Sequence, residues 1–177
     1  MERPHQGEPL PMELVNTRWL SRGRPVDFFE DDLGIGQWLA EGGFPESVAA
    51  AKPGLLEARD ALAEALARPG ADTEKRLNDV LAHGCVRLAL RDGELERTAR
   101  ADPGWLPAWT AVSRFVDLVG ARNDRVRQCA HPECVLYFHD TSRNGTRRWH
   151  SMETCGARSK AQRHYRRARP TPPAPGD

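Results

Sequence analysis

Apolar side chains recur every three or four positions in four stretches of the chain, which is the spacing of one buried helix face. Glycine and proline residues separate these stretches, because neither residue continues a helix readily. Four helices are therefore expected, over Leu33–Glu41 closed by Gly42-Gly43, from Pro53 in the first turn to the break at Pro69-Gly70, from a cap at Asp72 or Thr73 to Ala82, and over Trp105–Gly120. The last of these would bury Ala108, Val112, Phe115, Val116 and Val119.

A different pattern surrounds Asp92-Gly93: Val86, Leu88 and Leu90 alternate with their neighbours before this turn, and residues 95–100 return after it. Asp-Gly is a frequent two-residue turn between antiparallel strands, so a β-hairpin is expected here, although a helical interpretation remains open. Residues 13–121 are thus expected to form a mainly helical α+β body with a short β-hairpin.

The two ends of the chain lack these patterns. Residues 1–12 are expected to be a flexible N-terminus, and the proline-rich residues 170–177 are expected to be a disordered tail. No apolar run approaches the twenty residues that a membrane span needs, and the N-terminus lacks the apolar stretch of a secretory signal. No membrane partner is therefore expected.

Three cysteines and one histidine form two pairs, each with four residues between its members: Cys129, Cys134, His150 and Cys155. Three thiolates and an imidazole complete the tetrahedral coordination of Zn2+, which leaves no position for a substrate or water. The pattern predicts one structural zinc ion, with His131 and His139 as alternative histidine ligands. Disulfide pairing among the three cysteines of this pattern would leave an odd thiol, and Cys85 stands alone in an apolar context, so a reducing compartment is indicated and the expected location is the cytoplasm.

The residues around these ligands predict a zinc-finger module over residues 122–169, made of a knuckle, a β-hairpin and a basic helix. Val135–Phe138 and Thr146–Trp149 read as the two strands, because the Asn144-Gly145 pair between them favours a reversing turn. Residues 122–128 are polar and are expected to be a connection.

A helix is expected after Cys155, because no helix breaker occurs before Pro170. Residues 122–169 contain 12 Lys/Arg and 4 Asp/Glu, a net charge of +8, whereas residues 1–121 have a net charge of −6. This separation fits an acidic body joined to a module that contacts a polyanion, with DNA favoured. The candidate contacts are Arg143, Asn144, Arg147, Arg148, Arg158, Lys160, Arg163, Arg166 and Arg167.

Three other interpretations of the module remain open. RNA bases could stack on Tyr137, Phe138 and Trp149, the finger could bind an acidic protein, or the basic helix could be only a solvated face. No constellation typical of a catalytic site occurs, so the chain is not expected to be an enzyme.

The same segment also carries a resemblance to a known family. Its motifs are D-T-S-R-N at Asp140–Asn144, R-R-W at 147–149 and C-G-x-R at 155–158. On these motifs, residues 125–168 resemble the CGNR zinc finger of bacterial stress-induced transcription regulators, and Glu13–Glu41 looks like the N-terminal domain that accompanies it. The resemblance implies a zinc-containing regulator that binds nucleic acid, DNA or RNA.

Two residues depart from the family pattern. His150 stands where the family has its third cysteine, and Ala157 stands where it has the asparagine of C-G-N-R. Histidine also binds zinc, so the metal site is retained. Any role that depends on the asparagine amide does not carry over to this chain.

Bacterial regulators commonly join a nucleic-acid-binding module to a body that senses a ligand, so the body is a candidate sensor or dimerisation domain. Its candidate effector pocket combines hydrogen-bonding groups with an aromatic side chain, as small-molecule sites do: Asn16, Thr17, Trp19 and Asp27. The alternative is a capped turn beside a buried tryptophan. A small-molecule effector and a homodimer are both compatible with the sequence.

Overall fold

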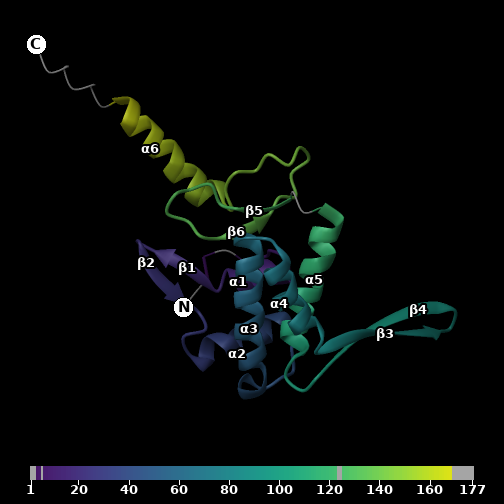
Figure 1. Cartoon of the computed structure of the whole chain (residues 1–177). Helices are drawn as coiled ribbons and strands as arrows, with labels where there is room; N and C mark the ends of the chain where they lie inside the picture. Colours follow the sequence, from purple (N-terminus) through teal and green to yellow (C-terminus); the bar gives the residue numbers. More distant parts are fainter. Residues whose placement is uncertain (1–2, 5, 123–124, 169–177) are drawn as a thin grey trace, which may run out of the picture.

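The computed structural model describes residues 3–4, 6–122 and 125–168, without the side chains of residues 121–122 and 166–168 (Figure 1). It is an α+β fold with a helical body and a C-terminal finger, as the sequence predicts. The described elements are, in order, α1 Leu10–Val15, β1 Arg18–Ser21, β2 Arg24–Asp27, α2 Asp32–Gly42, α3 Val48–Ala67, α4 Ala71–Leu81, β3 Gly84–Arg91, β4 Glu94–Ala101, α5 Leu106–Arg122, β5 Val126–Gln128, β6 Tyr137–His139, the π-helical turn η2 Met152–Gly156 and α6 Ala157–Ala168.

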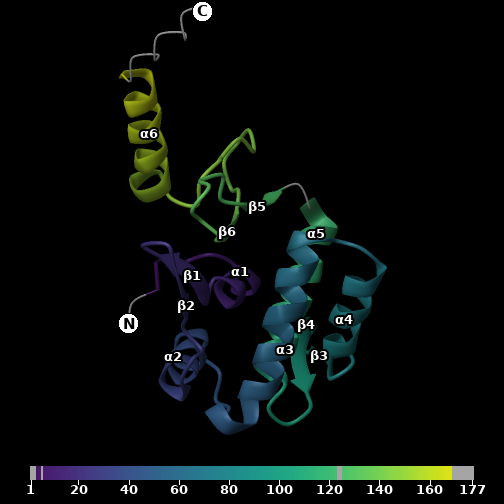
Figure 2. The ribbon, with the colours of Figure 1, turned by 60° about the vertical axis from the view of Figure 1, so that its left-hand side comes forward.

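Helix α3 is the centre of the body, because it packs against α1, α2, α4 and α5 (Figure 2). Leu55 and Leu62 of α3 and Val112 of α5 are completely buried between these helices. Burying one such side chain contributes about 1.5–3 kcal/mol, so this shared apolar face stabilises the helical packing.

The predicted helix after Pro53 begins earlier than expected. Helix α3 starts at Val48, because the Ser47 hydroxyl caps it by accepting a hydrogen bond from the Ala50 backbone N–H. Pro53 consequently lies in the second turn, where its ring nitrogen has no hydrogen to donate. The prediction of proline in the first turn is wrong, because a stronger cap precedes it.

The expected cap of α4 is also wrong. The helix begins at Ala71, and Thr73 lies inside its first turn, where its hydroxyl accepts a hydrogen bond from the Gly70 backbone N–H at 3.1 Å. The predicted helix over Leu33–Glu41 is confirmed by α2, which is capped at its C-terminus by Gly43 with φ of 70°. Helix α5 confirms the last predicted helix, except that Val116 is exposed.

Strands β3 and β4 form the predicted antiparallel hairpin, so the helical alternative for this stretch is wrong. Asp92 and Gly93 make its turn with φ of 50° and 84°, the left-handed conformation that this type of hairpin turn needs. The hairpin projects away from the helices (Figure 1).

The finger contains a different hairpin from the predicted one. Strand β5, Val126–Gln128, pairs antiparallel with β6, Tyr137–His139, so residues 126–128 are a strand and not a connection. Thr146–Trp149 forms no strand. The Asn144-Gly145 turn is present, with φ of 60° at Gly145, but it lies in a loop that returns to the metal ligands.

The described residues of the N-terminal segment are packed, which differs from the expected flexibility of residues 1–12. Met12 is completely buried in α1, and the buried guanidinium of Arg3 forms ion pairs with Glu13 and Glu41. The prediction missed this packing because it depends on acidic residues of α1 and α2 that lie far along the sequence. Residues 170–177 lie outside the described residues. Among the described helices, none has the length and apolar character required to cross a bilayer.

Candidate metal centre and nucleic-acid interface

The four predicted ligands come together at the junction of the finger loops. Cys129 follows β5, and a tight turn returns the chain to Cys134, whose backbone N–H donates to the His131 carbonyl at 2.9 Å. Cys155 lies in η2, directly before α6. We call residues 129–134 the knuckle and residues 140–150 the returning loop. The knuckle, the returning loop and the start of the basic helix α6 therefore meet at the metal ligands.

The donor set fits a tetrahedral zinc ion. One ligand atom from each of Cys129, Cys134, His150 and Cys155 lies within 4.8 Å of the other three. The Cys134 sulfur is 3.4 Å from His150 Nδ1, whereas His150 Nε2 lies 3.5 Å from the Thr154 hydroxyl, so Nδ1 is the ring nitrogen available to an ion. Ligands at zinc bond lengths of 2.0–2.3 Å lie about 3.3–3.8 Å apart, so the cluster needs only a small contraction around the ion. The metal prediction is confirmed.

The two alternative histidines lie outside this cluster. His131 is buried within the knuckle, and its Nδ1 accepts a hydrogen bond from the Glu133 backbone N–H at 3.2 Å. The turn between Cys129 and Cys134 directs this side chain inward. The backbone of His139 donates to Glu8 in the body, and its side chain is not among the metal ligands.

The three thiols influence one another because they are close. The hydrogen bond with Cys134 lowers the pKa of Cys129 to about 3, and the same contact, followed by burial, raises the pKa of Cys134. Burial, and then the negative charge of Cys129, raises the pKa of Cys155. Zn2+ is bound by thiolates, so protons leave the thiols of this cluster when the ion binds.

A buried carboxylate organises the loop that carries His150. Asp140 accepts hydrogen bonds from the Ser142 hydroxyl at 2.6 Å and from the backbone N–H groups of Ser142 and Arg147, both at 2.9 Å. Burial alone would raise the pKa of Asp140, but these hydrogen bonds outweigh it and lower the pKa. Asp140 remains ionised at neutral pH and fixes the turn that returns the chain to the metal.

The side chain of Arg147 points into this loop and binds its backbone. Its guanidinium donates hydrogen bonds to the backbone carbonyls of Trp149 and His150, and it lies 4.6 Å from the centre of the Phe138 ring. A guanidinium with these internal partners positions the ligand His150. Its place among the expected nucleic-acid contacts is therefore not supported by the geometry.

The other basic candidates are differently placed. Arg143, Asn144 and Arg148 are exposed in the returning loop, and Arg148 lies 5.2 Å from the centre of the Trp149 ring. Arg158, Lys160 and Arg163 are exposed on α6, which projects from the body (Figures 1 and 2). Arg166 and Arg167 belong to the same helix, but their side chains lie outside the described residues.

The expected effector pocket divides into two parts. Asn16 and Thr17 are buried and bonded internally: the Thr17 hydroxyl donates to the Leu14 carbonyl at 2.7 Å and accepts from Arg59 at 3.0 Å. Trp19 and Asp27, in contrast, line an open cavity of about 510 Å3 together with Val135 of the finger. Asn16 and Thr17 do not line this cavity.

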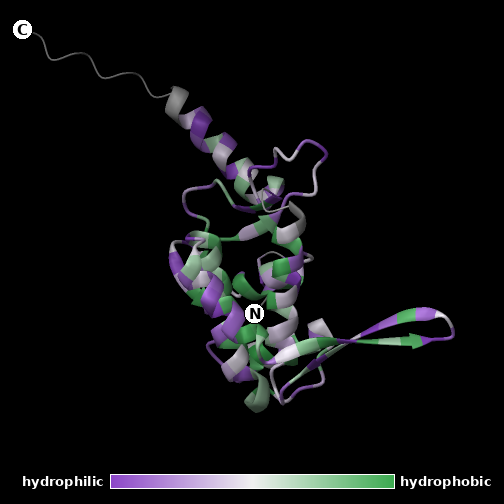
Figure 3. Cartoon of the chain, turned by 45° about the vertical axis from the view of Figure 1, so that its right-hand side comes forward, coloured by the Kyte–Doolittle hydropathy of each residue, from purple (hydrophilic) through white to green (hydrophobic). Residues whose placement is uncertain are grey.

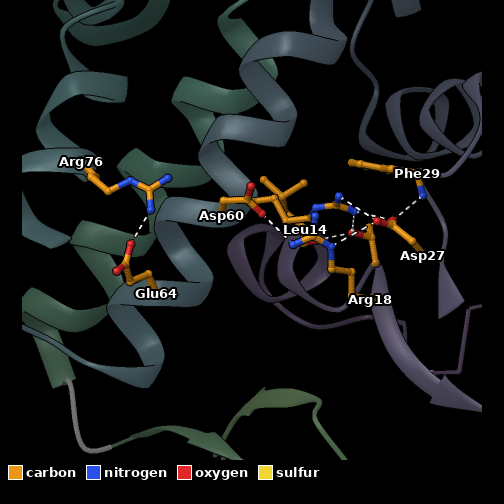
Figure 4. Close-up of polar contacts among 9 residues, drawn as sticks. Leu14, Arg18, Asp27, Phe29, Asp60, Glu64 and Arg76 are labelled. Carbon is orange, nitrogen blue, oxygen red and sulfur yellow. Dashed lines mark hydrogen bonds and ion pairs between the residues drawn. The ribbon is translucent and has the colours of Figure 1, made fainter. Parts of the chain in front are cut away.

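Asp27 is the centre of an ion-pair network on the body side of this cavity. It accepts two hydrogen bonds from the buried Arg59, at 2.6 and 3.0 Å, and one from Arg18, which also pairs with Asp60 (Figure 4). Burial alone would raise the pKa of Asp27, but the hydrogen bonds from Arg59 and from the Phe29 backbone lower it. The ion pair between Asp27 and Arg59 thus connects β2 with α3.

Two body residues that contact the finger backbone complete the site. The Asn16 amide bonds both to the carbonyl and to the N–H of Tyr137, and Glu8 accepts from the His139 N–H at 2.7 Å. Both contacts are made to β6. The sequence analysis singled out Asn16 but assigned it to a pocket. The sequence carries no signal for the role of Glu8, because the partner of Glu8, His139, is 131 residues away.

Two family models match the chain. Residues 8–122 match the ABATE family, described as "Putative stress-induced transcription regulator", and residues 125–168 match the CGNR zinc finger. The first match covers the helical body, and the second covers the metal centre and α6. No curated protein matches the chain significantly.

Proposed function

Because the chain belongs to the ABATE family of stress-induced transcription regulators and carries a CGNR zinc finger, we propose that it is a transcription regulator that binds duplex DNA through α6. The bound metal has a structural role: Zn2+ joins the knuckle, the returning loop and η2, and thereby fixes the direction of the helix. This proposed role involves no catalytic step, and the three thiolate ligands favour a reducing compartment such as the cytoplasm.

The observation that carries the proposal is the exposure of a basic helix directly next to the metal cluster. Of residues 157–165, all but Ser159 are exposed, and they include Arg158, Lys160 and Arg163. An exposed helix of this kind fits the width of the major groove, where arginine and lysine contact phosphates and guanine. Arg143 and Arg148 extend the positive charge along the returning loop.

The geometry favours DNA over the RNA alternative. Stacking of RNA bases requires exposed aromatic faces, but Phe138 is completely buried, and Tyr137 and Trp149 are half-buried. Trp149 is further covered by the guanidinium of Arg148. The cations of α6 are accessible without any rearrangement.

Ligand sensing forms the second part of the proposal. The cavity beside Trp19 and Asp27 is bordered by Val135 of the finger, so a molecule bound there would contact the body and the finger together. Filling the cavity with Val26→Trp should abolish thermal stabilisation by any small molecule that binds there. Stabilisation that persists in this variant would place the effector elsewhere.

Binding of the full-length chain to duplex DNA at increasing salt concentration tests the proposal. Each phosphate contact made by a cation contributes about −0.9 to the slope of log K against log salt, so Arg163→Gln should reduce the slope by about 1. Arg87→Gln is the matched control, because Arg87 is also exposed but lies on β3, away from α6.

Two results would refute DNA binding through α6. One is equal loss of affinity in Arg163→Gln and Arg87→Gln, which would indicate a general charge effect. The other is complete displacement of the duplex by single-stranded RNA of the same length at equal concentration, which would favour RNA.

A further inference from the structure

The N-terminal strap, by which we mean residues 3–4 and 6–8, carries the guanidinium of Arg3 into a buried site of the body. Arg3 is only 6% exposed. Its Nη1 lies 2.5 Å from a carboxylate oxygen of Glu13 on α1, and its Nη2 pairs with Glu41 on α2. The elements of the body carry many hydrophobic stretches (Figure 3), so a charge buried here depends on these partners.

The geometry of this site suits a guanidinium better than an ammonium group. Two terminal nitrogens of one planar group bind two carboxylates that come from different helices. The centre of the guanidinium also lies 5.5 Å from the centre of the Phe28 ring. A guanidinium makes such forked and stacked contacts together, whereas an ammonium is a compact point charge on a single atom.

Arg3 leaves both negative charge and space in the site. A cavity of about 270 Å3 adjoins its guanidinium and is lined by three carboxylates, those of Glu8, Glu13 and Glu41. Glu8 lies 3.8 Å from Arg147 of the finger, so Glu13 and Glu41 share the single charge of Arg3. The Nε atom of Arg3 is buried and has no hydrogen-bond partner among the described residues. The side chain of Arg3 therefore satisfies the site only in part.

We propose that this site binds the guanidinium group of a small external ligand, and that Arg3 occupies the site as an internal substitute when the ligand is absent. The guanidinium of the ligand takes the place of Arg3 between Glu13 and Glu41. The remainder of the ligand lies in the adjoining cavity, beside the ring of Trp38. The proposal does not rest on nucleic-acid binding, because neither the site nor its test involves DNA.

The strap connects this site with the finger. Pro4, the residue after Arg3, lines a small cavity beside the metal centre together with Cys134 and Arg158. Pro4 is itself exposed, so its place beside the finger depends on the anchor that Arg3 provides. Replacement of Arg3 by an external ligand removes this anchor and lets Pro4 leave the metal centre. Occupancy of the site is thereby communicated to the start of α6.

Titration of the full-length zinc-loaded chain with propylguanidinium, which reproduces the side chain of arginine, tests the site by calorimetry. Arg3→Ala should bind the probe, because its site is empty. The native chain should need at least about 10-fold more probe for half-saturation, because the tethered Arg3 competes at an effective concentration in the millimolar range. Arg24→Ala removes an exposed arginine of β2 and is the matched control, which should bind like the native chain.

Two comparisons establish the chemistry of the site. Propylammonium should bind Arg3→Ala at least about 10-fold more weakly than propylguanidinium, since it lacks the planar fork. Adding Glu41→Gln to Arg3→Ala should weaken binding of propylguanidinium by a similar factor, because one of the two carboxylates is lost. Zinc content and far-UV circular dichroism confirm that each variant is folded.

The link to the finger is tested by nuclear magnetic resonance. The probe should shift the amide signals of Val135 and Thr154, which line the same cavity as Pro4, in the native chain but not in Arg3→Ala, where the strap is already released. Absence of these shifts in the saturated native chain would refute the link.

Three results would overturn the proposed site: no binding to folded Arg3→Ala, equal affinity of Arg3→Ala and the native chain, or equal affinity for propylguanidinium and propylammonium. If Arg3→Ala does not fold, the native chain decides. Saturable binding that Glu41→Gln abolishes would then support the site, and binding that Glu41→Gln leaves unchanged, or no binding, would overturn it.

Discussion

The side-chain amide of Asn16 forms two hydrogen bonds to the backbone of Tyr137, one to its carbonyl at 2.8 Å and one from its N–H at 2.9 Å. An amide side chain that both donates and accepts in this way substitutes for a neighbouring strand along β6, whose other edge pairs with β5. The Asn16 side chain consequently attaches the finger to the body through hydrogen bonds to the finger backbone, which do not depend on the identity of the finger side chain.

Replacing Asn16 should therefore loosen the finger. Asn16 is almost completely buried, so Asn16→Ala leaves the polar groups of Tyr137 without their partners and should lower the free energy of unfolding by about 1–3 kcal/mol. Urea denaturation measures this loss, and hydrogen exchange should be faster at the Tyr137 amide. The control is Asn144→Ala at an exposed turn position; if it destabilises the chain as much as Asn16→Ala, the hydrogen bonds to β6 are not the cause.

The Asp27–Arg59 pair predicts a loss of stability in acid. The folded state lowers the pKa of Asp27 below its unfolded value, so the pair contributes fully above the unfolded pKa, and this contribution is lost as the pH falls through the folded pKa. Thermal melting between about pH 7 and pH 2 should show the loss beginning below about pH 5. Asp27→Asn should melt at a lower temperature at pH 7, and its melting temperature should fall less steeply than that of the native chain as the pH decreases below about 5. An equally steep fall in the variant would assign the acid sensitivity to other groups, such as other carboxylates or the zinc ligands, which take up protons in acid.

Arg147 should affect zinc affinity without touching the metal. Its guanidinium bonds to the carbonyls of Trp149 and His150, and a lysine at this position retains the charge but cannot reach both. Arg147→Lys should weaken zinc binding about 10–100-fold, as is usual for residues that orient a ligand. Competition with a chromophoric chelator measures the affinity. Arg148→Lys, at the exposed neighbouring position, should bind zinc like the native chain.

The departure from the family at position 150 gives a prediction about the ligand set. Cysteine completes the family cluster, so His150→Cys should bind zinc at least as tightly as the native chain, whereas His150→Ala leaves three ligands and should lose more than about 100-fold in affinity. X-ray absorption should show four sulfur neighbours in His150→Cys and three in the native chain. Equal zinc affinity in His150→Ala would exclude the histidine from the site.

The metal centre could be predicted from the sequence because its ligands are constrained by chemistry: Cys129, Cys134, His150 and Cys155 have few other uses at that spacing. The β3–β4 hairpin was predictable for a similar reason, since Asp92-Gly93 fixes the turn locally. The pairing of β5 with β6 was not, because the Asn144-Gly145 signal is the stronger local one and the three residues of β5 carry no clear alternation.

Contacts over long sequence distances explain the remaining errors. Thr17 and Asn16 were assigned to a pocket because their chemistry suits one, but their partners are Arg59 and the Tyr137 backbone, 42 and 121 residues away. Arg147 resembles its exposed neighbours in sequence, and only the folded loop shows that its guanidinium points inward. Polar side chains do not reveal from sequence whether they serve a ligand or the fold.

The most direct measurement combines zinc quantification of the purified full-length chain with hydrogen exchange before and after chelation. We predict one zinc ion per chain, and its removal should expose the amides of residues 126–139 and 150–165 while α3 and α5 of the body remain protected. A chain purified without zinc under reducing conditions, or an α6 that stays equally protected after the metal is removed, would contradict the claim that one ion positions the basic helix.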